Sequence, residues 1–119
     1  PCNLSQQIAI RLLKDKDTYI EKKDNDKIIH ERYIILKKSL DDYKLSDSVT
    51  VLPFNSGYFF TIKMPSKINA HDFRLKFLHD YKYGVYSMDN EHIRIAFSCL
   101  DKELIPDLVK NFKLCLNEF

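Results

Sequence analysis

The stretch EHIRIAFS, residues 91–98, has the alternation of a β-strand with one apolar face. Successive side chains of a strand point to opposite faces of its sheet. The apolar face is predicted to consist of Ile93, Ile95 and Phe97. The other face is predicted to consist of His92, Arg94, Ala96 and Ser98. The stretch therefore predicts a strand that covers a core on one side and carries an arginine in the middle of the other.

Arg94 is the side chain of this stretch with the clearest potential for binding. A guanidinium is costly to bury alone, and its planar fork of donors matches a carboxylate or a phosphate with two parallel hydrogen bonds. Beside the small Ala96 and Ser98, Arg94 is suited to line a pocket for an anionic group. The alternative is that Arg94 lies on a solvated sheet face or pairs with a nearby Asp or Glu, as most strand arginines do.

Further elements are predicted on both sides of this strand. Asn3 or Ser5 caps a helix to about Lys14, whose stripe of Ile8, Ala9, Leu12 and Leu13 is expected to pack against another surface. Thr18 and Glu21 form a capping box that starts a second helix, uninterrupted to Lys44. The second half of that helix has an apolar stripe at Ile29, Tyr33, Leu36, Leu40 and Tyr43. Its first half, residues 21–27, is polar on all sides, which is typical of a helix that bridges to another domain.

The remaining patterns complete an α+β domain. A turn between Pro53 and Gly57 precedes a strand over residues 58–63, which is expected to be central because both its faces carry aromatic residues. A helix is predicted over residues 69–82, and Gly84 is expected to be the residue that terminates it. Next come a short strand over residues 85–88 and the strand over residues 91–98. A last helix begins at about Asp101 and is expected to be irregular as far as Pro106. The order is ααβαββα, a small, largely antiparallel sheet covered by helices, with a long N-terminal bridging helix.

Composition limits the classes of protein to which the chain belongs. Its 119 residues are the length of one domain, residues 1–119, with 45% hydrophobic and 30% charged residues. The net charge of +2 is not gathered into a basic block, so we expect neither nucleic acid nor membrane as a partner. Three separated cysteines, Cys2, Cys99 and Cys115, are interpreted as reduced core thiols of a cytoplasmic protein. His71 and His79 lack metal-ligand spacing, so no metal site is predicted.

The order of the motifs resembles the C-terminal domain of the fold-type I, aspartate-aminotransferase-like class I/II enzymes that depend on pyridoxal phosphate. The resemblance spans nearly the whole chain. It is carried by LPFNSGYF (52–59), YGV (83–85), HIRIAFS (92–98) and the closing amphipathic helix, and upstream by NLSQQ (3–7) and the long helix. One departure concerns the segment YSMDNE (86–91), which stands where family members usually have a Pro-Gly-x-x-Phe-like loop.

The resemblance implies a substrate-clamping role for this domain. Arg94 takes the place of the arginine that binds the substrate α-carboxylate, with Asn55, Ser56 and Tyr58 as pocket-lining residues. The implied reaction is amino-group transfer between an amino acid and a 2-oxo acid, with pyridoxal phosphate as the electron sink. The large cofactor-binding domain is absent and no residue here takes the role of the Schiff-base lysine, so the chain alone is expected to be inactive. Full-length relatives are typically homodimers.

Two other observations bear on this interpretation. The chain opens Pro1-Cys2-Asn3-Leu4 without methionine, which suggests an excerpt or a processed product. A stand-alone ligand-binding or RNA-binding module stays open as the alternative, because Tyr58 and Phe60, with Lys63 beside them, could form an exposed sheet surface on which bases stack.

Overall fold

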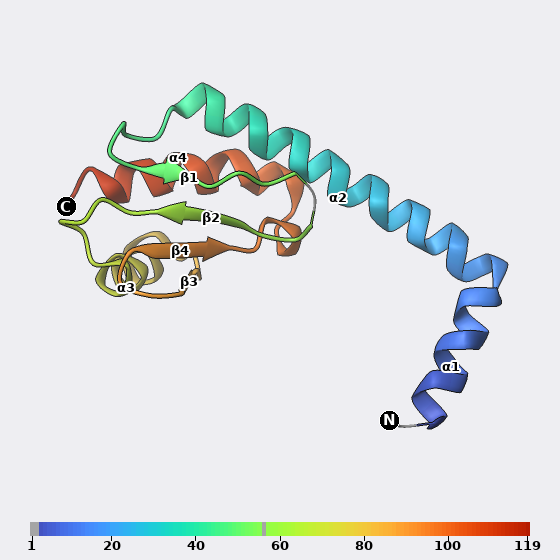
Figure 1. The fold of residues 1–119 in the computed structure, drawn as a ribbon. Coiled ribbons are helices and arrows are strands. Elements are labelled where there is room, and N and C mark those ends of the chain that lie inside the picture. The colour runs from blue at the N-terminus through green and yellow to red at the C-terminus, as the bar shows by residue number, and fades with distance from the viewer. Residues whose placement is uncertain (1–2, 56) are drawn as a thin grey trace.

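The chain folds into four α-helices and a four-stranded antiparallel sheet in a computed structural model that describes residues 3–55 and 57–119 (Figure 1). The helices are α1 (Asn3–Lys14), α2 (Lys16–Tyr43), α3 (Ala70–Tyr81) and α4 (Ile105–Leu116). The strands are β1 (Thr50–Val51), β2 (Phe60–Lys63), β3 (Tyr86–Ser87) and β4 (His92–Ile95). The predicted α+β class is confirmed, with one strand more than the sequence predicted.

The sheet has the order β1-β2-β4-β3, and each neighbouring pair is antiparallel. The two-residue strand β1 was not predicted, and it places β2 between two partners, so the expected central position of that strand is confirmed. Phe60 pairs with Ile95 and Thr61 with Arg94, while Tyr86 lies opposite Arg94 on the other side. Strands β2 and β4 are shorter than predicted, because regular pairing begins at Phe60 and ends at Ile95.

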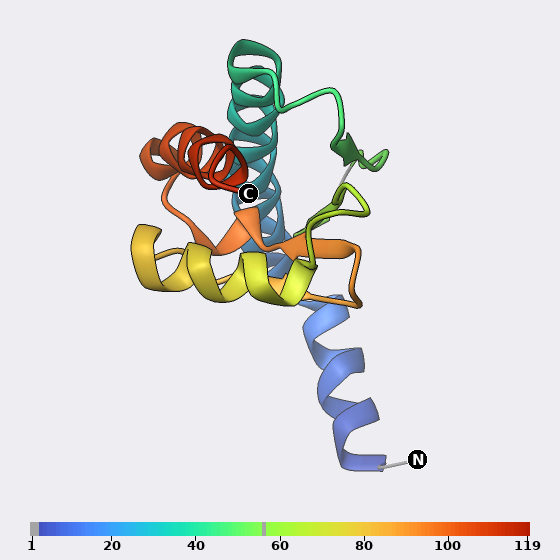
Figure 2. The same cartoon turned by 90° about the vertical axis from the view of Figure 1, so that its left-hand side faces the viewer.

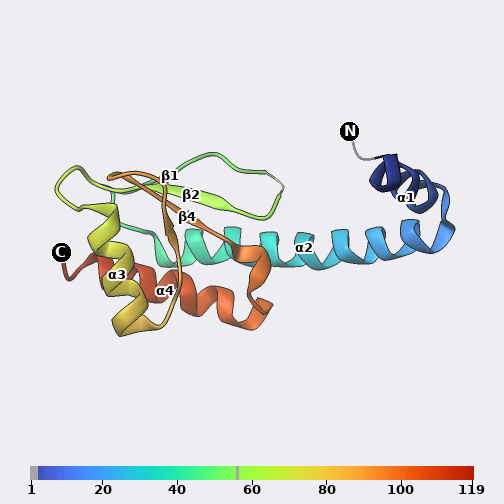
Figure 3. The ribbon, with the colours of Figure 1, turned by 90° about the horizontal axis from the view of Figure 1, so that it is seen from below.

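Helices α2, α3 and α4 cover one face of the sheet and leave the other open (Figure 3). The apolar residues of β4 point into this helix-covered core, where Ile93 and Ile95 are buried together with Phe97, which follows the strand in a short 3₁₀ turn. Aromatic rings fill the space between α3 and α4, with the centroids of Phe73 and Phe112 only 4.7 Å apart. The apolar face predicted from the alternation of residues 91–98 thus points into the core. The alternate side chains of β4 therefore lie on the open face of the sheet.

The long helix α2 packs over its second half and projects beyond the body over its first half (Figure 1). Leu36, a member of the predicted apolar stripe, is buried, and the other stripe residues are half-buried against the core. Ser39, which the stripe does not include, is buried as well. Its N-terminal cap is Asp15, whose carboxylate accepts a hydrogen bond from the Asp17 backbone N–H at 3.2 Å. The predicted capping box at Thr18 is therefore wrong, because Asp15 satisfies the free N–H one turn earlier and the Thr18 hydroxyl instead donates to Asp15.

Helix α1 has an apolar stripe but buries none of its residues. The predicted helix is confirmed, whereas no surface of the described chain packs against the stripe: Ile8 is 50% exposed and Leu13 is 85% exposed. Figure 2 shows α1 pointing away from the three covering helices, and Figure 3 shows it on the same side of α2 as the open face of the sheet.

Two further predictions are corrected by the structure, and a third is confirmed. Helix α3 ends at Tyr81 and is capped by Lys82, which adopts a left-handed conformation with φ 65°. Gly84, two residues beyond the cap, is therefore not the residue that terminates the helix. Cys99 is exposed, so the interpretation of the cysteines as core thiols holds for Cys115 and fails for Cys99, while Cys2 lies outside the described residues. The irregular start of α4 is confirmed as a 3₁₀ turn over Lys102–Leu104.

The helices of the described chain include none that is both long enough and apolar enough to span a membrane. Residues 3–55 and 57–119 also bring together no group of three His, Cys, Asp or Glu side chains that could hold a metal ion.

Candidate functional site

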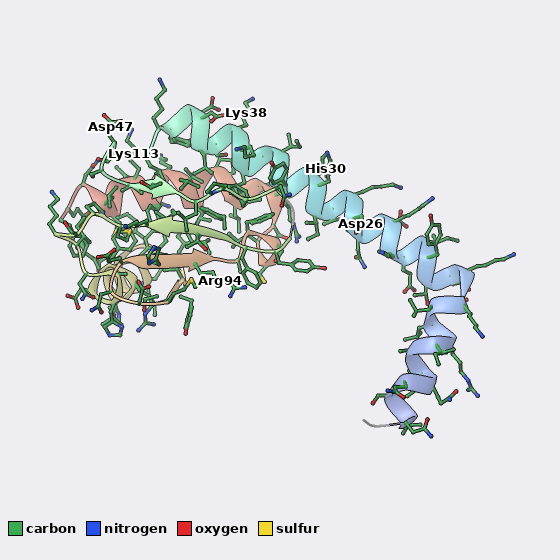
Figure 4. The ribbon with its side chains drawn as sticks, viewed as in Figure 1. Asp26, His30, Lys38, Asp47, Arg94 and Lys113 are labelled. Atoms are coloured by element: carbon green, nitrogen blue, oxygen red, sulfur yellow. The ribbon has the colours of Figure 1, made fainter. Side chains whose placement is uncertain are left out.

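Arg94 lies in the middle of β4 on the open face of the sheet, opposite the buried side chains of Ile93 and Ile95 (Figure 4). This is the position that the alternation of residues 91–98 predicted. Because the helices cover the other face, the guanidinium is not enclosed by the core and remains accessible to a ligand or a neighbouring domain.

The guanidinium lies over an aromatic ring and is not neutralised by a carboxylate. Its Cζ atom is 3.9 Å from the centroid of the Phe59 ring, which is the distance of a close cation–π contact. Among the ion pairs of residues 3–55 and 57–119, none involves Arg94. The structure thus contradicts the alternative in which Arg94 pairs with a nearby Asp or Glu, and it agrees with the one in which Arg94 lies on a solvated sheet face. No carboxylate of the described chain occupies its donors, so they are available for an anion.

A hollow of about 380 Å³ surrounds this arginine, which we name the Arg94 hollow. Its lining consists of Phe59, Gly84, Val85, Tyr86, Arg94 and Ala96. Arg94 is the charged member of this lining, and the other members are apolar or aromatic apart from the phenol of Tyr86. A small anion with an apolar remainder matches that combination, because the guanidinium supplies paired donors and the walls supply apolar contact.

The turn before β4 is held by Asp89. Its Oδ1 atom accepts hydrogen bonds from the backbone N–H groups of Glu91 and His92, both at 2.8 Å, and the His92 Nδ1 atom lies 2.9 Å from the same carboxylate. The bond from Glu91, followed by that with the His92 side chain, lowers the pKa of Asp89 below its ordinary value. The short segment over residues 86–91 therefore forms an ordered turn that directs the chain into β4.

The other predicted site residues do not line the Arg94 hollow. Asn55 and Tyr58 line a separate hollow of about 310 Å³, which we name the Asp26 hollow, together with Asp26, Ile29, His30, Tyr33 and Gly57. Ser56 lies outside the described residues. Tyr58 and Phe59 are neighbours in the chain, and each contributes to a different hollow. The segment over residues 57–59 is thus shared by both sites.

The sequence did not predict that residues of α2 line a hollow together with the loop before β2. Asp26, Ile29, His30 and Tyr33 have the spacing of one helix face. The edge-on contact of Tyr33 with Phe54, at 5.6 Å between ring centroids, brings that face against the loop before β2. Arg32 adds a second link, because its guanidinium donates a hydrogen bond to the backbone carbonyl of Ser98. The helical spacing was visible in the sequence, but its neighbour across the hollow was not.

The exposed aromatic surface expected for an RNA-binding module is not formed as predicted. Phe60 is 2% exposed and belongs to the core, so it cannot stack on a base, while Tyr58 precedes the strand. The open face instead carries Phe59 beneath Arg94.

Neither the Arg94 hollow nor the Asp26 hollow is lined for covalent attachment of pyridoxal phosphate. A covalently held cofactor needs a lysine, and neither hollow is lined by one within the described chain. Lys67, which follows Ser66, is exposed on the loop before α3.

Searches against protein-family models and curated proteins give no match. Solved structures do match. An α-aminoadipate aminotransferase from Thermus thermophilus, complexed with N-(5'-phosphopyridoxyl)-L-leucine, has a TM-score of 0.68 and 16% identity over 77% of this chain and 25% of its own. A multiple-substrate aminotransferase from Thermococcus profundus has a TM-score of 0.69 and 14% identity over 77% of this chain and 24% of its own. A decarboxylase from Sulfurospirillum multivorans has a TM-score of 0.72 and 24% identity over 95% of this chain and 29% of its own.

The chain therefore spans about a quarter of the length of these aminotransferases. At such identities the likeness shows the fold, and it confirms the fold that the motif order predicted. The match to the decarboxylase leaves fewer residues unmatched than the 12 that α1 contains, so part of this unpacked helix also belongs to the shared fold.

Proposed function

We propose that this chain is the small, C-terminal domain of a pyridoxal-phosphate-dependent aminotransferase, and that Arg94 binds the carboxylate of the amino-acid or 2-oxo-acid substrate. The observation that carries the proposal is the unpaired guanidinium of Arg94, exposed in an otherwise uncharged hollow on the open face of the sheet. The fold shared with a quarter of each aminotransferase supports it.

The residues of this chain bind and orient the substrate. A carboxylate that lies in the plane of the Arg94 guanidinium accepts two parallel hydrogen bonds, which fix its direction as well as its position. The cation–π contact with the ring of Phe59 helps to hold the guanidinium in place at the open face of the sheet. Held in this way, the substrate reacts from one orientation, and orientation of this kind lowers the barrier without any covalent step on this chain.

The missing large domain is proposed to supply the cofactor and the Schiff-base lysine. When bound there, pyridoxal phosphate would supply an electron sink for the chemistry at the amino-acid α-carbon. The open face of the sheet and the exposed stripe of α1 are surfaces that such a domain would cover. The parent enzyme is proposed to be a cytoplasmic homodimer.

Decarboxylation is the rival reaction within the same fold, because a decarboxylase is among the neighbours. The two reactions place opposite demands on Arg94. A carboxylate that must remain on the substrate is stabilised by a bidentate ion pair, whereas the same pair would hold back a carboxylate that has to leave as CO₂. A free Arg94 fork thus favours amino-group transfer.

The proposal is tested by assaying the enzyme that contains this chain for both reactions, with amino acids, 2-oxo acids and pyridoxal phosphate. We expect cofactor-dependent amino-group transfer by the whole enzyme and no turnover by the 119-residue chain alone. A lysine-specific, stoichiometric aldimine with turnover on the isolated chain would contradict the division of roles, and CO₂ release without transfer would replace the proposed reaction.

A further inference from the structure

The Asp26 hollow has a chemistry different from that of the Arg94 hollow and is not used by the proposed carboxylate clamp. It lies where α2 leaves the body, between one face of that helix and the loop before β2 (Figure 4). Its lining combines a carboxylate, an imidazole and two phenol rings, those of Tyr33 and Tyr58, with the aliphatic side chain of Ile29. Its volume of about 310 Å³ suits a small group and not a large cofactor.

The carboxylate of Asp26 has no partner among the residues that the structure describes. The neighbouring acid on the helix, Asp24, forms an ion pair with Lys27 at 3.0 Å, so that lysine does not neutralise Asp26. His30 lies one turn away on the same helix face and makes a ring contact with Tyr33, at 6.4 Å between centroids. The ion pairs of the described residues include none between His30 and Asp26. A carboxylate without an ion-pair partner in the described chain thus lines a hollow with aromatic walls.

We propose that the Asp26 hollow binds an ammonium group. A carboxylate supplies the counter-charge, and the faces of Tyr33 and Tyr58 attract a cation through the quadrupole of their rings. The imidazole of His30 adds a ring nitrogen that can accept a hydrogen bond. An anion would meet the unpaired carboxylate and is disfavoured. The proposal does not depend on Arg94 or on the identity of the reaction.

An ammonium group can come from two sources, a free small amine or a lysine side chain of another polypeptide. Both carry the same positive charge and the same N–H donors, so the hollow can bind either of them through the same contacts. A lysine side chain is attached to a polypeptide backbone, which would make additional contacts at the edge of the hollow, where Tyr58 is 59% exposed. A free amine has no such additional contacts.

The test is an NMR titration of the chain at pH 8 with n-butylammonium, with 1-butanol as the uncharged probe of the same length. We expect n-butylammonium to shift the amide signals of Gly57 and Tyr58 and the ring signals of His30 in a saturable manner, and 1-butanol to bind at least tenfold more weakly. A third arm uses N-acetyl-lysine N-methylamide. Tighter binding of this probe than of n-butylammonium identifies a polypeptide lysine as the source, and equal or weaker binding identifies a free amine.

Matched variants separate the site from general charge effects. Asp26→Asn should weaken n-butylammonium binding at least tenfold, whereas Asp42→Asn, the same charge change near the other end of α2, should change it less than twofold. Both residues are exposed, and a melting curve confirms that each variant is folded. Equal binding of 1-butanol, or equal effects of the two variants, would overturn the proposal, even if Arg94 proved to bind carboxylates.

Discussion

The guanidinium of Arg94 lies 3.9 Å from the ring centroid of Phe59, and the two side chains come from β4 and the residue that precedes β2. This contact joins the two central strands on the open face of the sheet. It leaves the edge of the guanidinium, where its N–H donors lie, free to meet a carboxylate.

Phe59→Leu should weaken substrate binding without abolishing it. A cation–π contact at an exposed site contributes about 0.5–1 kcal/mol, which corresponds to a roughly two- to fivefold increase in KM. Steady-state kinetics of the parent enzyme check this, with Phe59→Tyr as the control that retains the ring. If Phe59→Tyr weakened binding as much as Phe59→Leu, the contact with the ring would have no role in holding the arginine.

Gly57 is the position where the backbone requires glycine. Its φ of 110° is one that other residues rarely adopt, although nothing would contact an added Cβ atom. Gly57→Ala should therefore lower the free energy of unfolding by about 1–3 kcal/mol through backbone strain alone. Gly84→Ala is the control, because Gly84 has equal space and no such φ. Urea denaturation of both variants measures the difference, and equal stabilities would show that the turn tolerates a side chain.

The two cysteines that the structure describes should react at very different rates. Burial, followed by the charge of Glu118, raises the pKa of Cys115 to about 11, so little thiolate forms at pH 8. Cys99 is exposed. Peptide mass spectrometry after iodoacetamide treatment should show Cys99 modified while Cys115 stays intact until the protein unfolds. Equal labelling of both in the folded protein would mean that the core around α4 opens readily.

Amide hydrogen exchange should divide α2 into two parts. Residues 21–27 have no apolar surface to pack and should exchange rapidly in the isolated chain, as should α1. Residues 33–40, which pack on the core, should remain protected. Addition of the large domain should protect the exposed part. Uniform protection along the whole of α2 in the isolated chain would argue against a missing partner domain.

The sequence predicted the elements with strong periodicity and missed those that depend on distant neighbours. Residues 91–98 carry their two faces in plain alternation, so the inward Ile93 and the outward Arg94 could be assigned in advance. Strand β1 has only two residues, Thr50 and Val51, and it forms because β2 pairs with it. A pairing with a distant strand leaves no pattern in so short a segment of sequence.

The candidate site shows the same division. Arg94 was found by its place in a strand, but Asn55 and Tyr58 were assigned to its pocket and lie in another hollow. Asp26 and His30 were not found, because α2 is polar there and only the approach of the loop before β2 makes that face a hollow. Phe60 was interpreted as exposed, although its alternation with Ile62 and its pairing with Ile95 place it in the core.

The most direct test of the account is the kcat/KM of the parent enzyme carrying Arg94→Ala. Loss of one partner of a charge-assisted, bidentate contact costs roughly 2–5 kcal/mol, so kcat/KM should fall roughly 30-fold to several thousand-fold. Arg94→Lys should recover part of this, because an ammonium cannot reproduce the fork. Arg74→Ala on α3, away from the Arg94 hollow, should change kcat/KM little, and the melting temperature of every variant should stay near that of the wild type. Near-normal kcat/KM in Arg94→Ala, or a loss explained by unfolding, would contradict the carboxylate clamp.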